Sequence, residues 1–151
     1  MTGESDLTLL LSRLEELGFH RKTGRPARYP KPLINLKELS RDEIMEELKQ
    51  LPEWEPIISD IPGKEPLKRT EFKRVYEFAS FEDAMDFMHA ASKHVSEVDH
   101  HPRWENVWRT VTVWLSTWDI GHKPSRLDLD LARFLEDLRR SYPPPKKRTW
   151  G

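Results

Sequence analysis

Four segments of the chain carry apolar side chains every three or four residues, which is the spacing of a helix with one buried face. They span residues 6–19, 40–51, 81–98 and 125–140. The pattern therefore predicts four helices. The last three begin with a serine followed three residues later by an acidic side chain, which is the spacing of a capping box: Ser40 and Glu43, Ser80 and Asp83, Ser125 and Asp128.

Shorter segments between these helices alternate apolar and polar residues, as half-buried strands do. We expect strands at 54–59, 67–79, 103–108 and 110–118. In the order helix, two strands, helix, two strands, helix, neighbouring strands are joined by hairpins and the helices gather on one face. The predicted fold class is therefore α+β, with a four-stranded antiparallel sheet, three helices packed on one face, and an N-terminal helical extension.

An open sheet of this kind leaves surface that a single copy does not cover. Its edge strands carry unpaired backbone groups, and the alternation places Trp108 and Trp114 on the face away from the helices. Surfaces of this kind are commonly buried against a second copy of the same chain. We therefore expect a homodimer or a homotetramer.

Composition divides the chain into three parts. Residues 1–38 form an N-terminal extension, a short helix followed by a segment rich in proline and basic residues. Residues 39–141 form the compact domain, and residues 142–151 a basic, proline-rich tail. Between residues 20 and 37 there are six Lys or Arg and no acidic residue. This segment is either a solvated linker or an arm through which the extension binds an acidic protein partner.

The composition excludes several classes of function. The chain has no cysteine, which excludes disulfides, thiolate catalysis and cysteine-ligated metal centres. Its 25 basic and 26 acidic residues give a formal net charge of −1, which does not favour a nucleic-acid partner. The acidic start of the chain fits neither a secretory signal nor a transit peptide, and no apolar stretch approaches the roughly 18 residues of a membrane span. We therefore expect a cytoplasmic protein with no membrane partner.

The densest chemical feature of the chain is the sequence Asp99-His100-His101-Pro102. It follows the predicted helix 81–98, and Pro102 favours an extended conformation of His101, so both imidazoles can leave the helix and face one concavity. The helix C-terminus and the Asp99 carboxylate would each favour a protonated imidazole. Imidazoles that gain and lose protons near neutral pH are suited to general acid–base catalysis.

From these residues alone, a catalytic pair and an ordinary surface turn both remain open. The spacings are not those of metal ligands on one helix face, which argues against zinc held by His94, His100, His101 or His122. We therefore expect no metal. The end of the last strand offers hydroxyls, carbonyls and an aromatic face to a planar heterocycle, through Ser116, Thr117, Trp118 and Asp119.

The chain resembles the pterin-4a-carbinolamine dehydratase family in three spaced motifs: DHHPxWxNVW, then TVxxWLST, then Asp128 before a helix. The likeness covers roughly residues 39–140 and includes the upstream stretch EFKRVYEFASFEDAMDFM. Within it, the family signature is matched by His100, His101, Pro102, Trp108, Trp118 and Asp128. The position of Trp118 is often histidine in this family. We place the signature's first residue, a charged one in the family with three residues between it and the histidine pair, at Ser96, next to Glu97.

The resemblance implies a hydro-lyase that converts 4a-hydroxytetrahydrobiopterin to quinonoid dihydrobiopterin during tetrahydrobiopterin recycling, without a cofactor. It implies that His100 and His101 are the catalytic acid and base, without deciding which is which. Asp99 and residues 116–119 would then bind the pterin substrate. Glu97, Trp104 and Asp128 would support the site.

The resemblance also leaves a non-catalytic alternative open. Some relatives with this fold have lost the activity and serve as assembly factors, including chaperones of Rubisco, or as dimerisation cofactors of transcription regulators. Trp118 in place of a histidine and the basic extension would both fit such a role. The intact His-His-Pro group favours the enzyme.

Overall fold

The structure is a computed structural model that describes residues 36–145. The predicted helix at 6–19, almost all of the basic segment and the last six residues of the tail lie outside these described residues. The expected division at residue 38 therefore stays a prediction.

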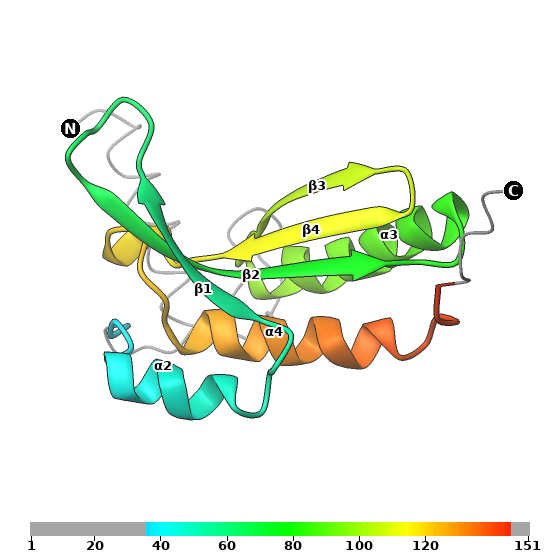
Figure 1. Ribbon diagram of the computed structural model, residues 1–151, viewed down its shortest axis with the longest axis horizontal. Coiled ribbons are helices and arrows are strands. Elements are labelled where there is room, and N and C mark those ends of the chain that lie inside the picture. Colours follow the sequence, from blue (N-terminus) through cyan, green and yellow to red (C-terminus); the bar gives the residue numbers. More distant parts are fainter. Residues whose placement is uncertain (1–35, 146–151) are drawn as a thin grey trace, which may run out of the picture.

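The described chain folds into one sheet and a layer of helices. In chain order the elements are α2 (Arg41–Leu48), β1 (Glu55–Asp60), β2 (Lys68–Glu77), α3 (Phe81–Val98), β3 (Arg103–Val107), β4 (Thr110–Leu115), the 3₁₀ turn η1 (Trp118–Ile120) and α4 (Arg126–Arg139). The four strands pair antiparallel in the order β1-β2-β4-β3. α3 and α4 lie along one face of the sheet, and α2 lies beside α4 (Figure 1). The predicted α+β fold is confirmed.

The predicted serine caps begin all three helices. Ser40 and Ser80 each accept a hydrogen bond from the backbone N–H three residues on, at 3.1 Å, and Ser125 forms a complete capping box. α2 ends at Leu48, three residues before the predicted end. Pro52 prevents the helix from continuing through Leu51, because a residue that precedes proline is disfavoured in a helical conformation.

The core lies between the sheet and the two long helices. The inward faces predicted for β2 and β4 are correct, because the apolar side chains assigned to those faces are fully or almost fully buried. Burial of one such side chain stabilises the fold by about 1.5–3 kcal/mol relative to exposure. The largest buried apolar side chains are Phe72, Tyr76, Phe78, Phe87, Val111, Val113, Leu115, Leu131 and Leu135.

Arg74, which interrupts the apolar face of β2, faces α4 and is paired there. Its Nε donates to Glu136 Oε1 at 2.7 Å, and the same oxygen accepts from Trp54 Nε1 at 2.8 Å and from the Tyr76 hydroxyl at 3.1 Å. Burial, reinforced by the Glu136 charge, raises the pKa of Tyr76 far above its usual value. One carboxylate thus joins β2, α4 and the segment before β1.

The face of the sheet away from the helices is more covered than the sequence predicts. Trp114 lies on this face, with the Arg103 guanidinium 4.0 Å and the Lys73 ammonium 5.9 Å from its ring centre. Arg103 also donates to Glu71, at 2.9 Å between Nη2 and Oε1. Trp108 was wrongly placed on this face; it lies in the turn between β3 and β4, with a positive φ of 51°.

The described chain begins beside the segment that leads from β4 to α4. The Leu39 N–H donates to the Pro124 carbonyl at 2.9 Å, and Pro124 immediately precedes the cap of α4. The N-terminal extension therefore joins the domain next to this segment.

Candidate active site

The candidate residues lie where the ends of three secondary-structure elements meet: the end of α3, the end of β4 and the start of α4. α3 stops at Asp99, whose backbone is left-handed with φ 51° and ψ 44°. This conformation turns the chain out of the helix, and Asp is one of the few residues other than glycine that adopts it readily. His100 and His101 consequently leave the helix, as the sequence predicts.

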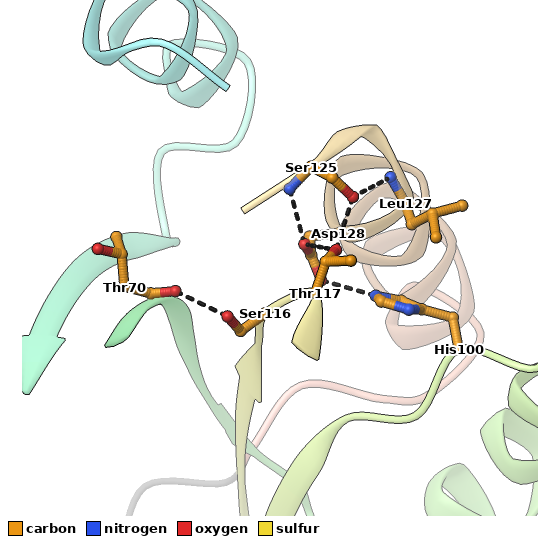
Figure 2. Close-up of polar contacts among 7 residues, drawn as sticks. All are labelled: Thr70, His100, Ser116, Thr117, Ser125, Leu127 and Asp128. Carbon is orange, nitrogen blue, oxygen red and sulfur yellow. Dashed lines mark hydrogen bonds and ion pairs between the residues drawn. The ribbon is translucent and has the colours of Figure 1, made fainter. Parts of the chain in front are cut away.

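Asp128 is the centre of the polar network (Figure 2). It is fully buried, and its Oδ1 lies 2.7 Å from His100 Nε2. Its Oδ2 accepts from the Thr117 hydroxyl at 2.7 Å and from the Ser125 backbone N–H at 2.9 Å. As the third residue of α4, it also lies in the positive field of a helix N-terminus. Three donors and the helix dipole stabilise a carboxylate in this buried position.

This network fixes the orientation and tautomer of His100. His100 is 8% exposed, so it is not part of an ordinary surface turn. A carboxylate only accepts hydrogen bonds, so Nε2 carries the proton that is shared with Asp128. Within residues 36–145, Nδ1 has no hydrogen-bond partner, and it is not a buried unsatisfied atom. Neutral His100 therefore presents an unprotonated nitrogen to a ligand, as a general base does.

His101 lies in a different environment. Its side chain is 57% exposed, and its Nε2 is 3.2 Å from Asp99 Oδ1. The two histidines are therefore distinct: His100 is hydrogen-bonded to a buried carboxylate, and His101 is exposed beside Asp99.

The predicted catalytic and substrate-binding residues line one pocket of about 240 Å³. This is below the roughly 300–1,000 Å³ of pockets that take drug-sized molecules, and it suits a compact ligand. The residues that the structure brings together here are Asp99, His100, His101, Ser116, Thr117, Trp118 and Asp119.

The two hydroxyls of this segment are turned toward protein partners. Ser116 Oγ donates to the Thr70 carbonyl of β2 at 2.9 Å, and Thr117 Oγ1 lies 2.6 Å from Ser125 Oγ as well as bonding to Asp128 (Figure 2). They hold the end of β4 against its neighbours. Trp118 is 59% exposed and leaves an aromatic face for a ligand. The sequence placed it in a strand over residues 110–118, but β4 ends at Leu115 and Trp118 begins the turn η1.

Comparison with known proteins identifies the family. The family model described as pterin 4 alpha carbinolamine dehydratase matches residues 37–138. The chain belongs to this family.

Individual members of the family agree with this result. A protein of Rhodopseudomonas palustris, named "Putative pterin-4-alpha-carbinolamine dehydratase", is 35% identical over 103 residues, which cover 68% of this chain and 92% of that protein. A protein of Opitutus terrae with the same name is 41% identical over 71 residues, 47% of this chain and 73% of that protein. A crystal structure of a transcriptional coactivator/pterin dehydratase from Brucella melitensis is 28% identical, with a TM-score of 0.56 over 68% of this chain and 99% of that one.

None of the three predicted supporting residues lines the pocket; Asp128 is fully buried and contacts His100. Trp104 points from β3 toward the core, and neither it nor Glu97 is among the described residues that line the cavity. The placement of the family signature's first residue at Ser96, next to Glu97, stays a prediction.

Two residues near the site were not assigned to it from the sequence. Ser125 was expected only as a helix cap, but its backbone and hydroxyl also join the Asp128 network. The ring of His122, considered only as a zinc ligand, lies beside that of Trp118. Among residues 36–145, no three His, Cys, Asp or Glu side chains are arranged to hold a metal ion. No helix in the described part of the chain is both long and apolar enough to span a membrane.

Proposed function

We propose that this protein dehydrates a pterin-4a-carbinolamine to the quinonoid dihydropterin in the pocket beside His100 and His101. The observation that carries the proposal is the contact of 2.7 Å between His100 Nε2 and the buried Asp128 carboxylate. This contact fixes one ring nitrogen as a donor and leaves the other as a base. A carbinolamine already eliminates water readily, so a positioned acid and a positioned base are the groups it needs.

The environments of the two histidines suggest their roles. His101, beside Asp99, protonates the hydroxyl on C4a, the carbon–oxygen bond breaks and water leaves. His100 Nδ1 accepts the proton from the neighbouring ring nitrogen, and a carbon–nitrogen double bond forms. Asp128 stabilises the resulting imidazolium, as a buried carboxylate does behind a catalytic histidine. One proton is taken up and one released, so the pair returns to its starting state by exchange with solvent.

The pocket also suggests how the substrate is held. A pterin is planar and polar at its edges, and the exposed Trp118 indole offers a face on which it can stack. The Asp99 and Asp119 carboxylates, which line the same pocket, can accept hydrogen bonds from the amino edge of the ring. In a cell, such an enzyme would return the oxidised product of a pterin-dependent hydroxylase to the tetrahydrobiopterin cycle.

The test is the rate of quinonoid dihydropterin formation with the purified full-length protein, measured against the spontaneous reaction. We expect His100→Ala and His101→Ala each to lower the catalysed rate by about 10²-fold or more, the usual value of one positioned proton-transfer group. His89→Ala, on the exposed side of α3, is the matched control and should keep the wild-type rate. A wild-type rate no higher than the spontaneous one would overturn the proposal.

The alternative is a binding role without catalysis. It is favoured by the Brucella melitensis neighbour, whose name joins a transcriptional coactivator to the dehydratase. On this alternative, the histidine substitutions would leave the binding of a protein partner unchanged, and the wild type would not accelerate dehydration.

A further inference from the structure

The loop that follows β4 folds back on itself beside the pocket. Thr117 and Lys123 close it as an isolated bridge, in which each backbone N–H donates to the other's carbonyl, at 2.9 and 3.4 Å. Between them, Gly121 and His122 have positive φ angles of 81° and 58°. Two successive residues in this conformation reverse the chain sharply. The reversal returns His122 toward Trp118.

The result is a pair of rings at the edge of the pocket. The centres of the Trp118 and His122 rings are 5.9 Å apart, and the ring planes are tilted by 41°, an arrangement that aromatic pairs favour. The His122 carbonyl accepts from the Thr70 N–H at 2.9 Å, which fixes this residue to β2. His122 itself is absent from the described residues that line the pocket. It contacts the pocket wall from outside.

We propose that His122 is a positioning residue, which holds the Trp118 indole in the orientation that stacks on a bound pterin. The inference rests on the proposed function for the identity of the ligand. An indole that is 59% exposed would otherwise occupy several rotamers, and ligand binding would have to select one of them. A ring already held in place lowers that entropic cost and so strengthens binding. His122 acts through Trp118, without touching the reacting atoms.

The effect is expected on affinity alone. Replacing His122 with Asn removes the ring and keeps a residue that tolerates positive φ. The loss of one preordered side chain should raise the dissociation constant and KM for the pterin about three- to tenfold. The turnover number should stay within about twofold, because His100, His101 and Asp128 are unchanged.

The experiment is calorimetric titration of the full-length protein with biopterin, a stable pterin, together with steady-state kinetics. Four proteins are compared with the wild type: His122→Asn, His122→Phe, Trp118→Ala and the double variant His122→Asn with Trp118→Ala. We expect His122→Phe, which keeps a ring, to bind biopterin like the wild type. If His122 acts through Trp118, its change to Asn should weaken binding in the wild type and have no further effect once Trp118 is Ala.

Three results would overturn the inference: unchanged biopterin affinity in His122→Asn, a loss that persists in the Trp118→Ala background, or a fall in turnover number without a change in affinity. If His122→Phe does not fold, as judged by thermal unfolding, the remaining double-mutant cycle decides. A wild type that binds biopterin but does not catalyse dehydration refutes the proposed function alone, and the affinities still test His122. A wild type that does not bind biopterin refutes both.

Discussion

Replacement of Asp128 by Asn is the sharpest perturbation of the site, because it changes the charge and hydrogen bonding of one group and keeps its shape. The carboxylate accepts three hydrogen bonds, from His100, Thr117 and Ser125. An amide has only one acceptor oxygen. If that oxygen keeps the Ser125 and Thr117 bonds, the amide NH₂ faces His100 Nε2 as a donor.

The consequence is a change of tautomer. Nε2 must then accept, so the proton moves to Nδ1, the nitrogen that should act as the base. We expect the dehydration rate to fall by about 10²–10⁴-fold, the range for loss of a positioned base or its correct tautomer. The protein should also lose about 1–3 kcal/mol of stability, because a charge-assisted buried hydrogen bond is lost.

Ser125→Ala is the matched control. It removes the hydroxyl that caps Leu127 and contacts Thr117, and it leaves the Asp128–His100 contact in place. Its cost should be about 0.5–2 kcal/mol, the usual value of an N-cap. Urea unfolding should therefore show similar losses for the two variants, whereas kinetics should separate them. An Asp128→Asn rate within about tenfold of wild type, or an equal rate loss in both variants, would refute the proposed role of the carboxylate.

Other predictions test the rest of the chain. Trp118→His should raise the dehydration rate or leave it unchanged, because it adds a titratable group to the pocket; a large decrease would contradict this. Glu136→Ala should cost about 2–4 kcal/mol in urea unfolding, since it leaves the Arg74 charge and two further donors without their acceptor. Deleting residues 1–37 should keep dehydratase activity, and total loss in a folded truncation would mean that the extension contributes to the site. Light scattering should give a dimer or tetramer at micromolar concentration, and a monomer would be evidence against it.

The sequence predicts the local structure of this protein well, because its elements carry local signals. Alternation gives the buried faces of β2 and β4, and serine caps give the three helix starts. The sequence-based predictions fail where a residue far along the chain, or the geometry of a turn, determines where a side chain lies. Arg74 interrupts a buried face because of Glu136, 62 residues later. Trp108 leaves the strand because the hairpin turn has no glycine and uses the tryptophan instead.

The same distinction applies to the site. The pocket residues were found because they fall in two short motifs, and the fold brings the end of α3 and the end of β4 together. The Asp128–His100 contact spans 28 residues, and no local pattern assigns the roles of the two histidines. The sequence treats them as an equivalent pair. Only burial and partners show that one is held rigidly by a carboxylate and the other is exposed.

The bond between Leu39 and Pro124 fixes where the N-terminal extension joins the domain. Residues 1–38 lead directly into Leu39, which is hydrogen-bonded to Pro124, two residues after His122 in the segment that follows Trp118. A protein bound by the extension would be tethered next to the pocket. Tethering of this kind can produce effective concentrations in the millimolar range. A hydroxylase held there would release its unstable product within reach of the site, and less of that product would decompose in solution.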